Sequence, residues 1–183
     1  MTRIIAGTAR GRRLVVPAGP TTRPTADRAR EGLFSSLQSL LDLEGAAVLD
    51  LYAGTGALGL EALSRGAGRA TLVESDPAAL SALRTNVTVL GLTELAQVLD
   101  QDVDDVLAGP PEPYDLVVAD PPYDLDVDPV LATLVPWLAP DAVVVVERRT
   151  RGPRPAWPEG LVPVRSRPYG EATLHYAVVG DPA

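Results

Sequence analysis

Four consecutive residues, Asp120-Pro121-Pro122-Tyr123, carry the groups that could activate an amine on a flat ring. The two prolines restrict the backbone, so that the Asp120 carboxylate and a peptide carbonyl are held towards one point. Both oxygens can accept N–H bonds from an exocyclic amine, which frees the nitrogen lone pair to attack a methyl group. Tyr123 offers a flat face on which a flipped base can stack. The alternative is a rigid turn whose acid and tyrosine have no chemical role.

A glycine-rich turn earlier in the chain could bind the donor of that methyl group. An apolar run ends in Asp50, and Gly54, Gly56 and Gly59 follow with the spacing G-x-G-x-x-G. By itself this spacing is typical of a dinucleotide site, where the backbone approaches a pyrophosphate. An acid at the strand end is unfavourable beside a pyrophosphate, but it suits the cationic sulfonium and amine of S-adenosylmethionine. Asp50 could also be a simple loop cap.

Two further acids follow predicted strands. Glu74 ends the run 70–74 and lies 20 residues after Gly54, the usual place of the acid that receives ribose hydroxyls. Asp102 follows the short strand predicted over 96–99 and could accept the adenine amino group. Its alternative role is to cap the next helix.

These residues need a sheet that brings the ends of several strands to one edge. Apolar runs alternate with helical spacings, which predicts an α/β, Rossmann-like fold with a mostly parallel sheet. Strands are expected over 48–51, 70–74, 96–99, 114–119, 142–146, 161–164 and 173–179. Helices are expected over about 25–41, from 59, over 77–90 and over 130–138, and residues 148–158 are expected to be a crossing segment.

The N-terminal residues predict a β-hairpin with a basic turn. Residues 3–6 and 14–16 are short apolar runs, and the turn between them carries Arg10, Arg12 and Arg13. Arginines at such a tip can reach the phosphates of a nucleic acid. A solvated hairpin with incidental arginines explains the pattern equally well.

The first predicted helix has an apolar stripe that includes Leu33 and Leu37, and Thr25 is placed to cap it. Arg28 and Arg30 are expected to point away from that stripe. Gly32 is unfavourable inside a helix, which suggests that another group approaches it closely.

The charge is distributed unevenly, although the net charge is −8. Residues 1–41 hold seven arginines against two acids, residues 42–141 hold three against 18, and residues 142–183 hold six against four. All 16 basic residues are arginine. Because a local basic face decides nucleic-acid binding, the acidic total does not exclude it.

Length and composition argue against a membrane protein, a secreted protein and a metalloprotein. The length of 183 residues fits one domain with a small appendage, and no apolar run is long enough to span a membrane. The chain begins without the apolar core of a secretory signal. It has no cysteine and one histidine, His175, so a cysteine or histidine metal site is not expected. We therefore expect a cytoplasmic, metal-free protein.

Taken together, these motifs resemble the bacterial 16S rRNA (guanine(966)-N(2))-methyltransferases, the RsmD family. The matching residues are Arg3-Ile4-Ile5-Ala6-Gly7, Gly11-Arg12, Arg23-Pro24-Thr25, Arg30-Glu31, Leu33-Phe34, Asp50 to Gly56, Glu74, Asn86, Asp120 to Tyr123 and Tyr169-Gly170. Many amino-methyltransferases share the glycine-rich motif and the Asp-Pro-Pro-Tyr motif. The N-terminal matches are the ones that narrow the resemblance to this family. Gly32 and Ser35 depart from the Ala and Asn usual there, and arginine replaces the family's lysines.

The resemblance implies a class I fold, with a seven-stranded, mostly parallel sheet and helices on both faces. It implies methyl transfer from S-adenosylmethionine to the N2 of one flipped guanine in 16S rRNA of the small ribosomal subunit. Residues 1–24 would be an RNA-binding hairpin extension, and residues 25–183 the methyltransferase domain. A monomer without membrane or metal is expected.

The expected site follows from the motifs and the resemblance together. The catalytic residues would be Asp120, Pro121, Pro122 and Tyr123. The donor would be bound by Thr25, Asp50, Tyr52, Ala53, Gly54, Thr55, Gly56, Glu74, Ser75, Asp102, Val103 and Asp120. RNA would be bound by Arg3, Arg10, Arg12, Arg13 and Arg23. Another amino-methyltransferase, such as an adenine-N6 DNA enzyme, and a non-catalytic donor- or RNA-binding module remain alternatives.

Overall fold

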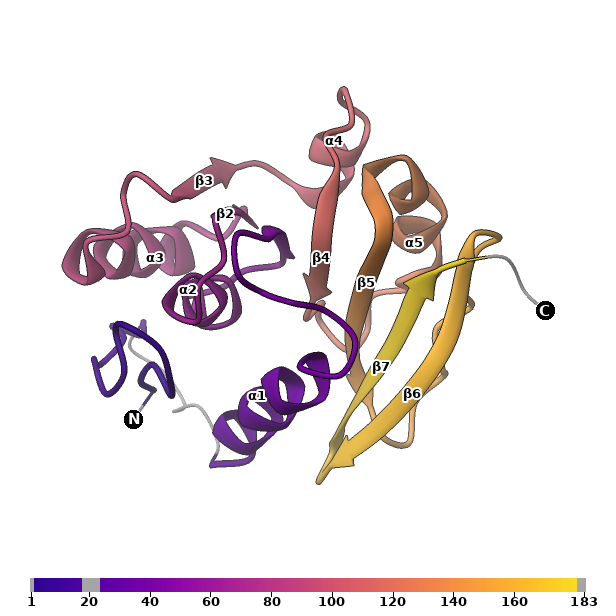
Figure 1. Cartoon of the computed structure of the whole chain (residues 1–183), viewed down its shortest axis with the longest axis horizontal. Coiled ribbons are helices and arrows are strands. Elements are labelled where there is room, and N and C mark those ends of the chain that lie inside the picture. The colour runs from indigo at the N-terminus through magenta and orange to yellow at the C-terminus, as the bar shows by residue number, and fades with distance from the viewer. Residues whose placement is uncertain (1, 18–23, 181–183) are drawn as a thin grey trace.

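The computed structural model describes residues 2–17 and 24–180 and shows one twisted sheet between two layers of helices (Figure 1). The strands are β1 (Ala47–Leu51), β2 (Arg69–Glu74), β3 (Ala96–Asp100), β4 (Tyr114–Ala119), β5 (Leu138–Arg149), β6 (Leu161–Tyr169) and β7 (Ala172–Val179). They form a seven-stranded sheet in the order β3-β2-β1-β4-β5-β7-β6.

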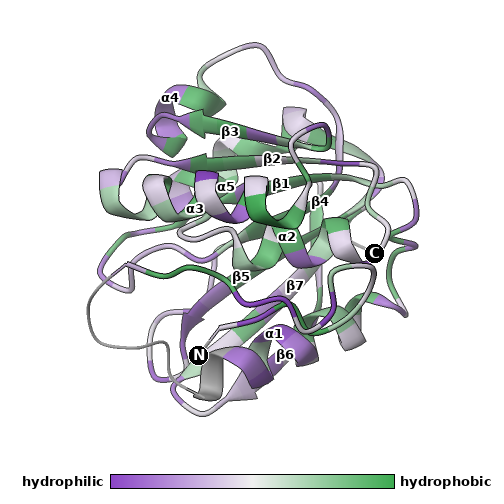
Figure 2. Ribbon diagram, turned by 90° about the vertical axis from the view of Figure 1, so that its left-hand side faces the viewer, coloured by the Kyte–Doolittle hydropathy of each residue, from purple (hydrophilic) through white to green (hydrophobic). Residues whose placement is uncertain are grey.

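The first five strands are parallel, and β7 and β6 close the sheet in antiparallel pairing. The predicted seven-stranded, mostly parallel sheet is therefore confirmed. The central strands are apolar along most of their length, because helices cover both of their faces (Figure 2). Parallel strands end at one edge, and ligands bind at this carboxyl edge in open α/β sheets.

The helices are α1 (Pro24–Leu37), α2 (Ala57–Ser64), α3 (Pro77–Leu90), α4 (Val103–Leu107) and α5 (Asp128–Leu134), followed by a 3-10 turn, η1 (Val135–Trp137). The first three pack on one face of the sheet, and α4, α5 and η1 pack on the other. The boundaries of α3 are as predicted: the Asp76 side chain accepts a 2.8 Å hydrogen bond from the Ala79 amide, and Gly91 ends the helix in a left-handed conformation.

Helix α1 confirms one expectation and corrects another. A Cβ built on Gly32 would lie 2.0 Å from the Tyr169 hydroxyl, so the end of β6 is the group that approaches this glycine. Arg28 is exposed, but Arg30 is only 5% exposed, and its prediction as an outward-facing residue is wrong. The physical reason is its spacing, because Arg30 precedes Leu33 and Leu37 by three and seven positions and so lies on the buried stripe.

The N-terminal segment, residues 2–17, folds back on itself with less regular structure than predicted. Arg3 and Arg13 form one isolated antiparallel bridge instead of two paired strands. Ile4, Ala9 and Leu14 are buried and belong to the core formed by α1, α2 and α3. The segment is therefore packed on the α1, α2 and α3 side of the sheet as part of the same core.

The fifth strand is longer than predicted at both ends. It begins at Leu138, which was expected to end a helix, and continues through Arg149. Arg148 therefore lies in the sheet and not in a crossing segment, because β7 pairs with β5 as far as the Arg149–Ala172 position. None of the helices within the described ranges has the length and apolar character needed to cross a membrane.

Candidate active site

A pocket of about 660 Å³ opens at the carboxyl edge of the sheet. This volume is typical of small-molecule sites. The pocket is lined by residues that follow β1, β2 and β4 and by one residue near the end of β5: Tyr52, Glu74, Ser75, Asp76, Asp120, Pro121, Pro122, Tyr123, Leu125 and Glu147. The fold thus gathers the Asp120-Pro121-Pro122-Tyr123 turn and part of the predicted donor site around one cavity.

The lining carries four carboxylates, Glu74, Asp76, Asp120 and Glu147, and no basic side chain. Such a surface attracts a cationic ligand and repels a pyrophosphate. This donor set fits S-adenosylmethionine, whose sulfonium and amine are positive, and does not fit a phosphorylated dinucleotide. The pocket thus supports the ligand class expected from Asp50.

The glycine loop is fixed to the end of β2 by Glu74. The Gly54 amide donates a 2.7 Å hydrogen bond to Glu74 Oε2, and the amides of Ser75 and Asp76 donate to Oε1 at 2.9 and 2.8 Å. Gly54 and Gly56 have φ values of 57° and 84°, which glycine adopts without steric cost. Glu74 therefore faces the pocket with an orientation set by three backbone amides.

Tyr52 precedes the glycine loop in an uncommon conformation for a residue with a side chain, with φ of 60°. Strained residues of this kind are frequent at ligand sites. Burial raises the pKa of Tyr52 to about 12, helped by the nearby Asp104 and Asp102 carboxylates. Its phenol is therefore neutral and available as a hydrogen-bond donor.

Asp50 lies beneath the loop and not in the pocket lining. It is 1% exposed, and its Oδ2 accepts a 2.8 Å hydrogen bond from the Gly59 amide in the first turn of α2. Burial raises its pKa to about 7, and Glu74 contributes in the same direction. The geometry is thus that of the capping alternative, in which Asp50 supports the glycine loop from beneath.

Of the residues that the structure describes, the others that were predicted to bind the methyl donor do not line this pocket. Ala53, Thr55 and Gly56 belong to the loop, and the Ala53 amide donates to the Val73 carbonyl at 2.9 Å. Asp102 is exposed at the start of α4 without a capping hydrogen bond, and Val103 is buried behind it. The Thr25 side chain lies outside the described residues, as does Arg23.

The Asp120-Pro121-Pro122-Tyr123 turn is held by a buried arginine at the end of β5. Arg148 is 4% exposed and donates hydrogen bonds to the carbonyls of Pro122 (3.3 Å), Tyr123 (3.2 Å) and Leu125 (2.8 Å). Within the described part of the chain, the Pro121 carbonyl has no hydrogen-bond donor. The turn therefore offers one unoccupied carbonyl beside the Asp120 carboxylate.

Asp120 and Glu147 are neighbours across β4 and β5. The strand register pairs Ala119 with Val146, so the next residues of the two strands lie side by side. Asp120 lines the pocket and is exposed to solvent there. Desolvation and the Glu147 charge raise its pKa, and desolvation also raises the pKa of Glu147. Each carboxylate would be stabilised by a ligand that donates N–H bonds or carries positive charge.

Tyr123 is positioned by two side chains from β5. Its hydroxyl donates a 3.3 Å hydrogen bond to Glu147 Oε1, and the Arg149 guanidinium lies 4.9 Å from its ring centroid. The side chain remains 38% exposed. A flat aromatic face is thus presented at the mouth of the pocket, as stacking on a base requires.

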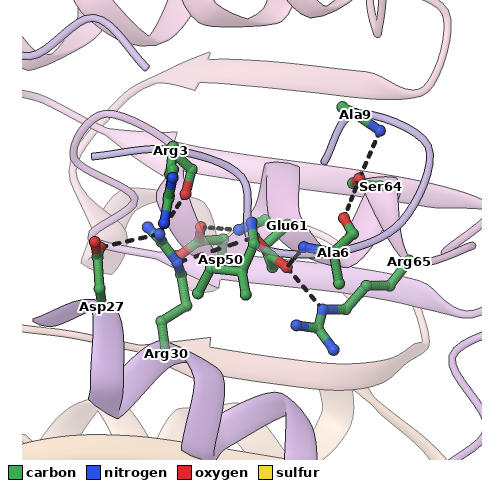
Figure 3. A network of polar contacts seen from close by, with 11 residues as sticks. Arg3, Ala6, Ala9, Asp27, Arg30, Asp50, Glu61, Ser64 and Arg65 are labelled. Carbon is green, nitrogen blue, oxygen red and sulfur yellow. Dashed lines mark hydrogen bonds and ion pairs between the residues drawn. The ribbon is translucent and has the colours of Figure 1, made fainter. Parts of the chain in front are cut away.

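A second polar network fastens the N-terminal segment to α1 and α2 (Figure 3). The fully buried Glu61 accepts hydrogen bonds from the Ile5 amide at 2.7 Å, the Ala6 amide at 3.0 Å and Arg65 Nε at 2.8 Å. Arg30 Nε lies 4.0 Å from Glu61 Oε2. Its other end bonds the Arg3 carbonyl and Asp27.

Asn86 connects the same segment to the glycine loop. Its side chain accepts a 2.7 Å hydrogen bond from the Val15 amide and donates 2.9 Å bonds to the carbonyls of Val15 and Thr55. Asn86 is 1% exposed, so this bridge is shielded from water. The N-terminal segment and the loop therefore share one buried side chain.

The exposed arginines of the N-terminal segment lie away from the pocket. The Thr8 amide donates to the Ser64 carbonyl at the end of α2, and Arg12 donates to the Val89 carbonyl near the end of α3. Since both helices run back from the carboxyl edge, these ends lie towards the opposite edge of the sheet. Arg3, Arg10 and Arg13 are also exposed. RNA bound to them would have to extend along the α2–α3 side to reach the pocket.

Sequence reasoning missed Glu147 as a pocket residue, Arg148 as the residue that holds the Asp120–Tyr123 turn, and Glu61 and Arg30 as a buried pair. The sequence contained signals for some of these residues. Arg30 precedes Leu33 and Leu37 by three and seven positions, which places it on the buried stripe of α1. Glu147 and Arg148 directly follow a buried valine run, at the same strand end where the other acids were recognised. Among the described residues, no group of three or more histidines, cysteines or acids has a geometry suited to a metal ion.

Comparisons with known proteins identify relatives of this chain in sequence and in fold. Residues 2–178 match the family described as conserved hypothetical protein 95. The chain is 40% identical to the ribosomal RNA small subunit methyltransferase D of Escherichia coli (strain K12) over 159 residues, 85% of this chain and 79% of that protein. The Haemophilus influenzae protein of the same name is 38% identical over 151 residues, covering 79% and 77% of the two chains. The solved structure of the E. coli protein yhhF is 36% identical, covers 98% of both chains and superposes with a TM-score of 0.87.

Proposed function

We propose, because the chain belongs to the RsmD-like methyltransferase family described as conserved hypothetical protein 95, that it methylates the N2 amine of a guanine in 16S rRNA. The fold is the Rossmann-like class I methyltransferase fold. By analogy with the family, the proposed target is guanine 966 of the small ribosomal subunit. A ribosomal substrate would be met in the cytoplasm, and the protein is proposed to act as a monomer.

The observation that carries the proposal is the pair of acceptors at the pocket. The Asp120 carboxylate and the unoccupied Pro121 carbonyl lie on adjacent residues of one rigid turn. An exocyclic amine has two N–H bonds, one for each acceptor. Accepting both bonds draws the nitrogen towards a tetrahedral geometry and localises its lone pair, which prepares it to attack a methyl carbon.

S-adenosylmethionine, when bound, supplies the electrophilic methyl group. In this chain Glu74 is oriented to receive the ribose hydroxyls, and the carboxylates of the pocket favour the positive charges. Tyr123 stacks on the flipped guanine, and Arg148 keeps the turn in place. The amine loses a proton after methyl transfer, and the Asp120 carboxylate, whose pKa is raised and which accepts one of the amine's N–H bonds, is the group proposed to accept it.

The RNA contacts are proposed for the exposed arginines of the N-terminal segment, Arg3, Arg10, Arg12 and Arg13, together with Arg23. Arg149 lies at the mouth of the pocket on Tyr123 and is available to a phosphate beside the flipped base. This arrangement would place one basic surface near the reacting base and another towards the far edge of the sheet. An adenine-N6 methyltransferase or a non-catalytic binding module would use the same pocket and is separated by experiment.

The test is methyl transfer from labelled S-adenosylmethionine to unmodified small subunits, free rRNA and duplex DNA, followed by nucleoside mass spectrometry. N2-methylguanosine in rRNA is the expected product. Asp120→Ala should lower the rate by at least about 10³-fold, because orientation and proton acceptance are lost together. Donor affinity should change far less.

Asp124→Ala is the matched control, because Asp124 is an exposed acid in the same loop and does not line the pocket. Its rate should equal that of the unmodified protein. Methyladenine in DNA would replace the proposed substrate, and donor binding without any methylated product would favour the binding module.

A further inference from the structure

Glu147 stands beside the catalytic turn but is not explained by methyl transfer alone. Its position next to Asp120 follows from the pairing of β4 and β5, and both side chains line the same pocket. The amine needs two acceptors, and the turn already supplies them with Asp120 and Pro121. A third acceptor in the pocket must therefore face another donor.

The carboxylate of Glu147 is poorly satisfied for a group that is only partly exposed. Among the described residues its one hydrogen bond comes from the Tyr123 hydroxyl, at 3.3 Å to Oε1. No described arginine forms an ion pair with it, since Arg148 is directed to the turn carbonyls and Arg149 to the Tyr123 ring. Partly buried carboxylates normally have stronger partners, so this one is available to a ligand that donates N–H bonds.

The edge of guanine carries such a donor directly beside its amine. N1–H and N2–H₂ are adjacent on the ring, and a carboxylate accepts from this edge with both oxygens. In adenine the atom beside the N6 amine is N1, which is an acceptor. A carboxylate placed there would face a lone pair and repel adenine, while it would bind guanine.

We infer that Glu147 selects guanine, by accepting the N1–H bond of the flipped base while Asp120 and the Pro121 carbonyl accept the two N2–H bonds. Tyr123 remains bonded to Oε1 and leaves Oε2 for the base. The inference rests on the proposed function and adds to it a residue that decides which base is methylated. Glu147 contacts the base, and its effect on the methyl donor is limited to the charge that it shares with the three other carboxylates of the pocket.

The first test uses the unmodified protein and changes the base. Small-subunit RNA is prepared with 2-aminopurine in place of the target guanine, which keeps the N2 amine but has an acceptor at N1. The expected kcat/KM is at least about 100-fold lower than for guanine, because a site built to accept a hydrogen bond rejects a base that lacks the donor. Equal methylation of the two bases would overturn the inference.

The second test changes the residue. In Glu147→Gln the amide can donate to N1 of 2-aminopurine, so the preference for guanine should fall to within about tenfold. Tyr123→Phe is the control: it removes the hydroxyl that donates to Oε1, and the preference for guanine should persist even where stacking or rate changes. Glu159→Gln, an exposed glutamate, controls for the loss of charge.

Calorimetric titration with S-adenosylmethionine and thermal unfolding accompany each variant. Donor binding close to that of the unmodified protein is expected for Glu147→Gln. A variant that slows guanine and 2-aminopurine equally would overturn the selective role while leaving the methyltransferase proposal intact. If the unmodified protein forms no N2-methylated product on any RNA, the proposed function itself fails.

Discussion

Glu61 and Glu147 are two glutamates with opposite surroundings. Glu61 is fully buried and accepts three hydrogen bonds of 3.0 Å or less, with Arg30 completing its environment. Glu147 lines an open pocket and receives one long hydrogen bond from Tyr123. The first carboxylate is satisfied by the chain itself, whereas the second has accepting capacity to spare.

The difference separates a structural role from a ligand-binding role. A buried charge is tolerated when every polar atom around it has a partner, and its removal then leaves those partners unsatisfied. Desolvation raises the pKa of Glu147, and a desolvated carboxylate with few partners gains from a ligand that supplies donors. Both residues are glutamates, so the residue type does not distinguish the structural role from the ligand-binding role. The number and geometry of the hydrogen-bond partners distinguish them.

The largest effect is expected from Glu61→Ala. This change leaves Arg30 buried without its acid and removes the acceptor of the Ile5 and Ala6 amides. The free energy of unfolding should fall by about 3–5 kcal/mol. Urea unfolding measures it, with Glu159→Ala as an exposed control. If Glu147→Ala destabilised the protein as much as Glu61→Ala, the comparison would lose its basis.

A smaller effect on activity is expected from Arg148→Met. The change keeps the length of the side chain but removes the donors of three turn carbonyls, so Asp120 and Pro121 lose their fixed orientation. We expect kcat to fall by about 10- to 100-fold, since a displacement near 1 Å has effects of this size. Arg151→Met, an exposed arginine nearby, should have little effect. Unchanged kcat in Arg148→Met would show that the prolines hold the turn by themselves.

The smallest effect is expected at the exposed arginines of the N-terminal segment, which the Glu61 network fastens to α2. Replacing Arg10, Arg12 and Arg13 by Ala leaves the backbone bonds to Glu61 in place, so stability should change little. RNA affinity should fall by roughly tenfold at physiological salt, and the slope of log K against log salt should become shallower by about 2–3. Fluorescence anisotropy over a salt series measures both quantities. A slope equal to that of the unmodified protein would sink the RNA-binding role of this segment.

Local patterns predicted most of the sheet and the positions of its ligand-binding loops. The glycine turn after Asp50 and the capped helix after Asp76 are encoded by neighbouring residues, and the structure places them as expected. The end of the fifth strand was placed too early, because the Glu-Arg-Arg sequence is polar and only its pairing with β7 continues the strand. The function of Glu147 depends on that extension.

Other features depend on contacts between distant segments, which no local pattern contains. Arg30 is buried because Glu61, in another helix, and the Arg3 carbonyl lie beside it. The N-terminal segment was expected to pair with itself as a hairpin. Its two arms do pair, through hydrogen bonds from the Ile4, Gly11 and Leu14 amides, but other amides of the segment bond to α2 and to Asn86, so the ladder stays irregular.

The way in which the N-terminal segment is attached has a consequence for protein engineering and for divergence among relatives. Its anchoring donors are main-chain amides, those of Ile5, Ala6, Ala9 and Val15 among them, and the acceptors belong to the domain. A main-chain amide is the same whatever side chain accompanies it. The exposed positions can therefore change identity freely, provided that the buried apolar residues and the closely packed Gly7 are kept. The segment could therefore carry a different exposed surface without disturbing the bonds that fasten it to the rest of the molecule.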